Sequence, residues 1–335
     1  MKKSNGKSSP NVAGRKAAKP LSPMTRLLAA LLYGGSSLSL MFVNKYVLTV
    51  NGFPSASTLA LLQMCVTIVL VPVMKEMGIV SYPDFSKRVL FSVFPLPLIF
   101  LGNTIAGLMA TKGVSIPMYA CLRRFSIFFL MVGERLFLEV VHSARVKACV
   151  MVMLLGAIIA AADDLTFDPV GYSSMMVCNV LTASNGIVAK LKLSRLPSGS
   201  DKGKVPELGT WGLMFYNALW SAPILCVFLA FFKSNEVAAV TRFDGWSRPS
   251  FVFLFMLSCF MGTLIQLAIF YCTQINGPLT TGVVGSLKNI ISTFAGMVLP
   301  GMEYIFSWTN FFGVLVSLVA SLVYSYEKIV GGKKK

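Results

Sequence analysis

Ten apolar stretches, each long enough to cross a lipid bilayer, constrain the fold of this chain more than any other feature. They cover approximately residues 26–49, 56–75, 89–110, 115–134, 145–163, 170–189, 210–232, 250–272, 278–300 and 306–326. A helix of about 20 residues spans the hydrocarbon core, where unpaired backbone groups are not tolerated. Because 55% of the residues are hydrophobic and only 13% are charged, the sequence predicts an all-α membrane protein with ten transmembrane helices.

Basic residues in the loops indicate the orientation of the chain. If the N-terminus is cytosolic, the cytosolic segments carry 22 Lys and Arg, whereas the opposite side carries Lys112, Lys233, Arg242 and Arg248. Cytosolic loops of membrane proteins are enriched in Lys and Arg. We therefore expect both termini in the cytosol, and we attribute the net charge of +17 to orientation rather than to nucleic-acid binding.

A weak internal repeat divides the chain into two halves. Residues 120–137 and 284–301 align in a way that pairs Arg124 with Lys288, and five predicted helices in each half invert the second half relative to the first. The predicted organisation is a disordered basic cytosolic tail (1–25), a first repeat (26–163), a second repeat (170–326) and a basic cytosolic tail (327–335). Inverted repeats are typical of secondary transporters, whose substrate site lies near the membrane midplane.

Four basic residues, Lys45, Arg123, Arg124 and Lys288, lie inside the predicted helices, whereas the thirteen acidic residues lie at helix ends or in loops. A cation in the middle of the bilayer costs about 2.5–3.5 kcal/mol, so this set predicts a site for a phosphate-bearing anion. Lys45 could alternatively be held by carbonyl groups or reach the interface. Arg123 and Arg124 point about 100° apart on a helix, so we expect at most one to face the cavity squarely.

Small and amide side chains surround Lys288 in the sequence. Thr281, Gly285 and Ser292 share one helical face, which would let a ligand approach the backbone. Asn289 offers an amide that can both donate to and accept from a sugar hydroxyl or a base edge.

A second polar group interrupts the apolar helix predicted at 210–232. Phe215, Tyr216 and Asn217 are adjacent there. An aromatic ring can stack on a nucleobase and an amide can bind its edge. The alternative is a core aromatic pair beside an interhelical amide hydrogen bond.

Enzymatic motifs are missing from the sequence. The single histidine, His142, and the seven cysteines, which form no CxxC pair, predict no metal site, and no acidic cluster suits Mg²⁺. There is no Walker loop for an ATP-driven pump. We expect no enzyme and no cofactor, and infer facilitated exchange of an anionic solute.

The order of these motifs resembles a known family. The segments are VNKYVLTVNGFPS (43–55), FPLPLIFLGN (94–103), IPMYACLRRFSI (116–127), FYNA (215–218), PLTTGVVGSLKNI (278–290) and YIFSWTNFFG (304–313). Together they are similar to the nucleotide-sugar transporters of the drug/metabolite transporter superfamily, and most similar to the branch that carries UDP-glucuronic acid, UDP-N-acetylgalactosamine and UDP-N-acetylglucosamine. The resemblance covers about residues 30–328.

The resemblance implies roles for individual residues. Phe215, Tyr216 and Asn217 match the motif associated with the base. The motif associated with sugar and phosphate maps to Gly285, Ser286, Leu287, Lys288 and Asn289. Arg123 and Arg124, together with Asn44 and Lys45 in the first matching segment, complete the expected substrate-binding residues.

Two departures bear on the substrate. Ala218 stands where GDP-mannose transporters carry Asn, and Lys288 precedes Asn289 where their order is reversed. Both favour a UDP-sugar over GDP-mannose. Plastid sugar-phosphate exchangers carry a Lys–Arg pair on this helix, so Asn289 also counts against a small sugar phosphate.

The expected function is antiport of a UDP-sugar from the cytosol into the Golgi lumen in exchange for UMP, by alternating access. The alternatives are exchange of GDP-mannose or a small sugar phosphate, residence in the endoplasmic reticulum, and, in a different class, a membrane scaffold without transport. The expected partners are the nucleotide sugar, the nucleoside monophosphate and membrane lipids. The sequence identifies neither the sugar nor the oligomeric state, and a homo-oligomer is left open.

Overall fold

The computed structural model describes residues 22–113, 119, 122–161, 168–194, 208–287 and 308–330, and no strand occurs among them. The helices are α1 (Pro23–Lys45), α2 (Ala56–Glu76), α3 (Lys87–Ser92), α4 (Leu96–Gly113), α6 (Phe125–Phe137), α7 (Ala144–Ala161), α8 (Pro169–Leu193), α9 (Gly209–Phe232), α10 (Ser234–Thr241), α11 (Pro249–Asn276), α13 (Trp308–Val330) and a helix over 278–287. A π-helical turn, Tyr46–Val50, extends α1. The all-α prediction is confirmed for this part of the chain.

Polar residues start several of these helices. The side chains of Ser22 and Ser55 accept hydrogen bonds from backbone N–H groups in the first turns of α1 and α2. Asp168 does the same for α8. Such caps satisfy N–H groups that have no partner within the helix, so each apolar run begins at a residue that the sequence marks.

Four described helices are long and apolar enough to cross a membrane, and they are Pro23–Val50, Ala56–Glu76, Gly209–Phe232 and Pro249–Asn276. All four coincide with predicted spans. The predicted span 89–110 is not one helix, because residues 93–95 form a turn between α3 and α4. Pro95 explains the interruption, since it lacks the N–H that a continuous helix requires.

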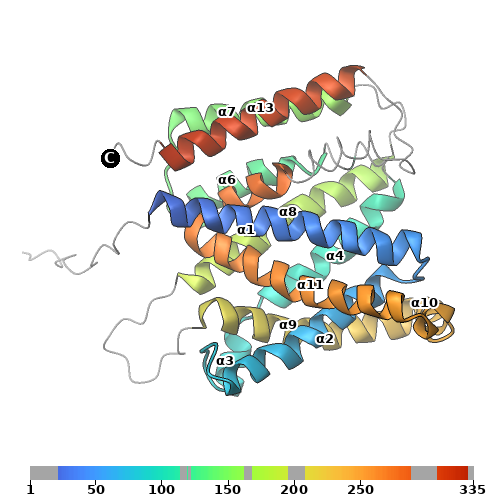
Figure 1. Ribbon diagram of the computed structural model, residues 1–335. Helices are drawn as coiled ribbons and strands as arrows, with labels where there is room; N and C mark the ends of the chain where they lie inside the picture. Colours follow the sequence, from blue (N-terminus) through green and yellow to red (C-terminus); the bar gives the residue numbers. More distant parts are fainter. Residues whose placement is uncertain are drawn as a thin grey trace, which may run out of the picture.

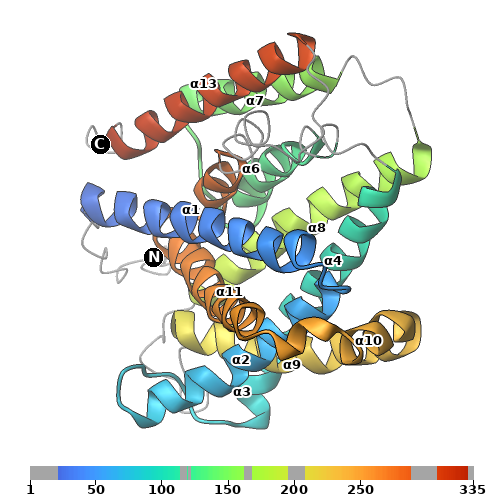
Figure 2. The same ribbon diagram turned by 45° about the vertical axis from the view of Figure 1, so that its right-hand side comes forward.

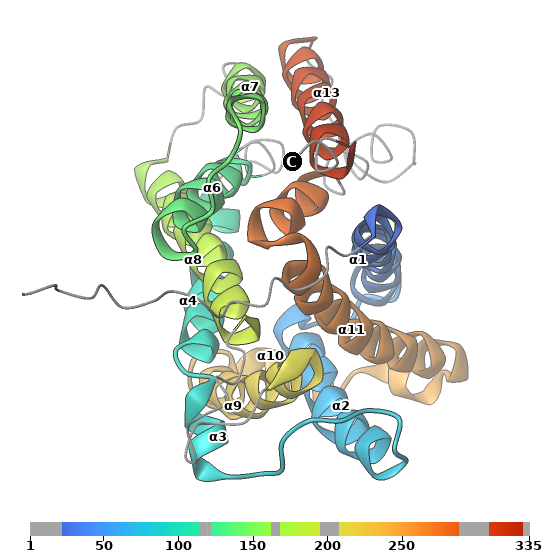
Figure 3. The ribbon, with the colours of Figure 1, turned by 90° about the vertical axis from the view of Figure 1, so that its left-hand side faces the viewer.

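The helices pack in pairs whose members are far apart in the sequence. The pairs are α1 with α11, α4 with α8, α2 with α9, and α7 with α13 (Figures 1 and 2). In Figure 3, α4, α6, α7 and α8 lie on one side and α1, α11 and α13 on the other. Helix α9 is buried over most of its first half, as expected of a helix that is apolar all round.

The seam between α7 and α13 depends on a glycine. A Cβ atom added to Gly156 would lie 2.4 Å from the Ser317 Oγ and 2.7 Å from the Gly313 carbonyl oxygen. The Ser317 hydroxyl donates to the Met153 carbonyl oxygen across the seam at 2.9 Å. Small residues allow this close approach of two backbones, as in other membrane helix pairs.

The first and last described helices fit the expected placement of the termini. Helix α1 begins, and α13 ends, at the same end of the bundle (Figure 1). We refer to this end, at which α6, α8 and α11 also finish, as the terminal end. The loop charges predict that it faces the cytosol.

Candidate functional site

A turn at Arg123 and Arg124 interrupts the helical path of the fourth predicted span. Leu122 is helical, the two arginines form the turn, and α6 begins at Phe125. The prediction of a continuous helix is therefore corrected here. The break lies inside the bundle, since the Arg124 side chain is only 5% exposed.

The turn directs the two guanidinium groups to different surroundings. Arg123 is half-buried, and its Nη1 donates to the Tyr119 hydroxyl at 2.8 Å. Its guanidinium also lies 5.8 Å from the centre of the Tyr119 ring. Arg124 is buried. A cation at either position provides the donors that a phosphate group needs.

Helix α8 holds this break in place. The Asn179 side chain, which is fully buried, donates to the Leu122 carbonyl oxygen at 2.8 Å. Leu122 directly precedes the turn, so Asn179 takes the place of the missing intrahelical donor to its carbonyl group. One turn further along α8, the Thr182 hydroxyl donates to the Asn103 Oδ1 at 2.8 Å, which fixes α4 to α8 at the same level.

Gly285 packs against α1. A Cβ atom added to Gly285 would lie 2.9 Å from the Tyr33 hydroxyl. Arg123 is close enough to act electrostatically on the same hydroxyl. Tyr33 therefore contacts Gly285 from the second half of the chain and lies in the electrostatic field of Arg123 from the first half. Ser286 beside it is buried, whereas Lys288 and Asn289 lie outside the described residues.

The predicted base-binding residues on α9 form a separate group. Tyr216 is fully buried, and its hydroxyl donates to the Pro83 carbonyl oxygen at 3.0 Å. Phe215 packs against Tyr82 with ring centroids 5.3 Å apart. Asn217 is buried, and its Oδ1 has no hydrogen-bond partner among the residues that the structure describes. The described contacts of Phe215 and Tyr216 are thus with the α2–α3 loop and the core, not with the arginines.

The α2–α3 loop is itself held by charge. Lys75 pairs with Asp84, and its ammonium group lies 4.5 Å from the centre of the Tyr82 ring. The hydrogen bond and the charge of Lys75 lower the pKa of the Asp84 carboxyl. Tyr82 and Pro83 in this loop contact Phe215 and Tyr216 on α9.

Asn44 belongs to a polar network in which three helices meet. Its Oδ1 accepts from the Ser258 hydroxyl at 2.6 Å. Gln63 donates to the Ser258 Oγ at 3.1 Å, which joins α1, α2 and α11. Lys45, the next residue, is half-buried where α1 passes into its π-helical turn. Neither side chain has a described contact with Arg123 or Arg124.

Sequence reasoning missed a buried acid at the terminal end. Glu134 was expected at a helix end, but α6 continues to Phe137 and the Glu134 side chain is only 4% exposed. Its Oε1 accepts from the Leu279 backbone N–H at 2.6 Å, and its Oε2 lies 3.0 Å from the His142 Nε2. The only signal was the unique histidine, His142, eight residues after Glu134.

The start of helix 278–287 is shaped to receive this carboxylate. Gly277 follows α11 with a φ of +89°, a conformation that favours glycine. A Cβ atom there would also lie 3.2 Å from the Glu134 Oε1. An acid at a helix start satisfies a free N–H group and complements the helix dipole. Glu134 thus fixes the entry of the helix that carries Gly285 and Ser286.

The described site offers cations, amides and hydroxyls rather than metal ligands. Among the described residues, no three His, Cys, Asp or Glu side chains gather in a way that could hold a metal ion. The chemistry available near Arg123, Arg124 and Tyr33 is binding of an oxyanion.

Comparisons with known proteins identify the family of the chain. A family model described as the Triose-phosphate Transporter family matches residues 25–325. The UDP-sugar transporter UST74c of Drosophila melanogaster is 41% identical over 298 residues, which are 89% of this chain and 76% of that protein. The nucleotide sugar transporter SLC35D2 of Mus musculus is 37% identical over 92% of this chain and 91% of that protein. The UDP-sugar transporter sqv-7 of Caenorhabditis elegans is 36% identical over 90% of this chain and 88% of that protein.

A solved crystal structure shares the fold. It superposes with a TM-score of 0.58 at 14% sequence identity, over 90% of this chain and 95% of that one. The resemblance inferred from the sequence motifs is confirmed by the family and its relatives. The chain belongs to the triose-phosphate transporter family of the drug/metabolite transporter superfamily, and it is a transporter and not an enzyme.

Proposed function

We propose that this protein exchanges a UDP-sugar for UMP across a membrane of the secretory pathway. The sugar belongs to the class of N-acetylglucosamine, N-acetylgalactosamine and glucuronate, and transport runs from the cytosol to the lumen by alternating access. The observation that carries the proposal is the burial of Arg124 at a helix break inside the bundle. Relatives named as UDP-sugar transporters, at 36–41% identity, support the substrate class.

The pairing of the helices supports an inverted repeat as the transport architecture. Exchanging the two halves turns the α4–α8 pair into the α11–α1 pair, and both pairs occur. In the same exchange, α7 and α13 take each other's places, and so do α2 and α9. Both pairs are in contact, as two-fold-related helices that lie beside the axis must be. In transporters built this way the two repeats rock around a central site, and the proposed site uses Arg124 from one half and Lys288 from the other.

The phosphates are the proposed ligands of the basic residues. Arg124 and Lys288 would bind the diphosphate, with Arg123 beside them and Lys45 and Asn44 at the edge of the cavity. A buried cation is costly in a bilayer, so a phosphate would offset the cost when the site closes around it. An empty cavity that changes orientation slowly would make transport an obligatory exchange.

Base and sugar are the proposed ligands of the neutral residues. Asn217 is buried and its Oδ1 has no partner within the described part of the chain, so it can accept from the imide N–H of uracil, with Phe215 and Tyr216 as its aromatic neighbours. Asn289 and Ser286 would bind the sugar, and Gly285 would allow close approach. UMP and a UDP-sugar share the base and one phosphate, so one site can serve both.

We place the protein in the Golgi membrane, with the endoplasmic reticulum membrane as the alternative. The loop charges support cytosolic termini. In this orientation the terminal end faces the pool of nucleotide sugars.

Thermal stability in the presence of nucleotides tests the proposal. Purified protein in detergent would be heated with UMP, GMP, CMP or AMP, because a ligand that binds the folded state raises the melting temperature. We expect UMP to give the largest shift, and Arg124→Gln to abolish it while the exposed Arg135→Gln retains it. A larger shift with GMP would point to GDP-mannose, and no shift with any nucleotide would favour a scaffold.

A further inference from the structure

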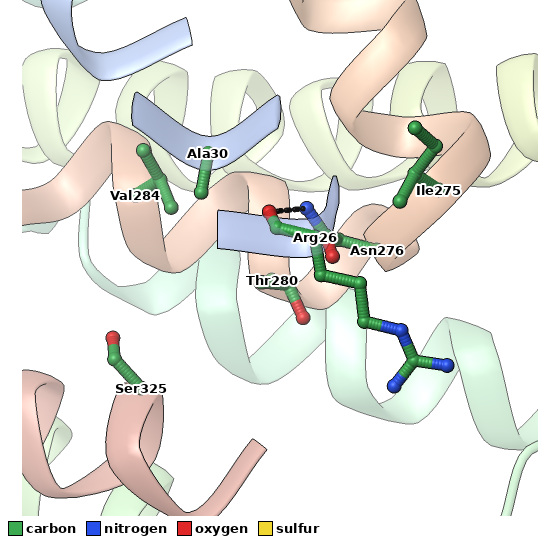
Figure 4. Close-up of a pocket in the computed structure, with 7 residues that line it drawn as sticks. All are labelled: Arg26, Ala30, Ile275, Asn276, Thr280, Val284 and Ser325. Atoms are coloured by element: carbon green, nitrogen blue, oxygen red, sulfur yellow. Dashed lines mark hydrogen bonds between the residues drawn. The ribbon is translucent and has the colours of Figure 1, made fainter. Parts of the chain in front are cut away.

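The terminal end of the bundle contains a cavity that the proposed transport site does not use. It has a volume of about 230 Å³ and lies between α1, the end of α11, helix 278–287 and α13. Its polar lining residues are Arg26, Asn276, Thr280 and Ser325 (Figure 4). The sequence assigned Arg26 only to the orientation of the chain.

Arg26 supplies an unused donor to this cavity. Its Nε is buried and has no hydrogen-bond partner, and Arg26 forms no ion pair within the described part of the chain. Its backbone is fixed, because the Asn276 side chain donates to the Arg26 carbonyl oxygen at 2.9 Å. A buried guanidinium nitrogen without an acceptor is costly, and an oxyanion would provide the missing acceptor.

Hydroxyl groups face the same space. The polar ends of Arg26 and Thr280 point to the same side of the cavity, and the Ser325 hydroxyl lies across it (Figure 4). The Thr280 Oγ1 is 3.1 Å from the Tyr324 hydroxyl, which holds its rotamer. The Arg26 guanidinium and the Thr280 hydroxyl, which come from two different helices, form a donor pair suited to phosphate oxygens, whereas Ser325 lines the opposite side of the cavity.

The size of the cavity restricts the ligand. Pockets for whole small-molecule ligands measure roughly 300–1,000 Å³, so 230 Å³ admits a phosphate-bearing head group and not a complete nucleotide sugar. Outside the cavity, α1 exposes Leu28 and Leu31, and α13 exposes Leu322 and Val323. These side chains offer an apolar surface to acyl chains beside the cavity.

We propose that the cavity at Arg26 binds a phosphate oxyanion, supplied by an anionic phospholipid head group. Basic pockets between transmembrane helices on the cytosolic side are suited to such head groups, and the terminal end is the predicted cytosolic side. Thr280 lies in the first turn of helix 278–287, so the bound phosphate touches the helix that carries Gly285 and Ser286. Free inorganic phosphate offers the same chemistry and is the second source to test.

Binding to the purified full-length protein tests the site. Its melting temperature would be measured in mixed micelles with phosphatidylcholine in which the fraction of phosphatidylserine is increased stepwise. A separate series would use inorganic phosphate as the ligand. We expect Arg26→Gln to weaken the apparent affinity at least about tenfold, because charge-assisted hydrogen bonds are lost. The matched control, Arg135→Gln, removes an exposed cation from α6 and should bind as the wild type does.

A second variant keeps the test valid if Arg26→Gln does not fold. Ala30→Phe fills the cavity from α1, and Leu31→Phe adds a ring at the neighbouring position, where Leu31 is 60% exposed. The proposal predicts that Ala30→Phe loses phosphate binding and that Leu31→Phe retains it. An Arg26-dependent response to phosphatidylserine identifies the lipid as the source, and one to inorganic phosphate alone identifies the free ion. The site would be overturned if Arg26→Gln bound these ligands as well as Arg135→Gln did, and Ala30→Phe as well as Leu31→Phe did. This outcome does not depend on which nucleotides the protein transports.

Discussion

The Glu134 carboxylate accepts a hydrogen bond from the Leu279 backbone N–H at 2.6 Å, joining α6 in the first half of the chain to the first turn of helix 278–287 in the second. The carboxylate is buried and also faces His142 at 3.0 Å. One acid therefore fixes the entry of a helix that carries expected substrate-binding residues. The contact therefore links the two halves of the chain at the terminal end.

Glu134→Ala should destabilise the protein, because the Leu279 N–H would be left buried without an acceptor. The expected loss in the free energy of unfolding is about 1–3 kcal/mol from this group alone. Glu134→Gln retains an acceptor and should lose less. Thermal unfolding of both variants in detergent measures the difference, and a Glu134→Ala protein as stable as the wild type would show that the contact contributes nothing.

Gly285→Ala should reduce both stability and transport, because the new Cβ would meet the Tyr33 hydroxyl at 2.9 Å. Overpacking of this kind costs about 1–3 kcal/mol. Tyr33→Phe removes the obstructing oxygen and should restore most of the loss in the double variant. Gly35→Ala, on the same helix as Tyr33 with no heavy atom within 4 Å, is the control. Failure of Tyr33→Phe to restore the double variant would contradict the contact.

A glycine substitution in the α7–α13 seam should not be rescued by shortening the opposing side chain. Gly156→Ala places a Cβ 2.7 Å from the Gly313 backbone oxygen as well as against Ser317. Removing the side chain with Ser317→Gly therefore should not restore stability. Gly107→Ala, where the nearest atom is 3.6 Å away, should be tolerated. Melting temperatures of the single and double variants measure this, and full recovery in Gly156→Ala/Ser317→Gly would mean that the backbones can separate.

Substitutions at Tyr216 and Asn217 should have separate effects, the first mainly on protein stability and the second on UMP binding. Tyr216→Phe loses the hydrogen bond to the Pro83 carbonyl oxygen, which should cost about 0.5–1.5 kcal/mol and leave the UMP affinity nearly unchanged. Asn217→Leu should weaken UMP binding by at least about tenfold. Melting curves with and without UMP give both quantities. The reverse pattern would assign base recognition to the Tyr216 hydroxyl.

The sequence predicts the helices well because lipid restricts the backbone so strongly. Ten apolar runs and Pro-marked or Ser-marked ends are local features, and described helices occupy all or part of every predicted span. The break at Arg123 and Arg124 is not local. The Leu122 carbonyl group at this break is buried and accepts its hydrogen bond from Asn179, which lies 57 residues further along the chain.

The site was predictable only as a set of residue types. Cations inside predicted membrane helices that hold no acid in the sequence suggest an anion site, and Arg124 is indeed buried inside the bundle. That Tyr33 would contact Gly285, or that Glu134 would face Leu279, depends on how helices from different halves meet. The packing of Tyr216 against the α2–α3 loop is likewise tertiary, since the same residues suit either a core or a base.

Exchange in proteoliposomes tests the central claim most directly. Labelled UDP-N-acetylglucosamine, UDP-N-acetylgalactosamine and UDP-glucuronate would be offered to proteoliposomes that are empty or loaded with UMP. We predict uptake of at least one of them into UMP-loaded vesicles, little uptake into empty vesicles, and loss of uptake in Arg124→Ala but not in Arg135→Ala. Equal uptake with and without internal UMP, or unchanged transport in Arg124→Ala, would contradict the account.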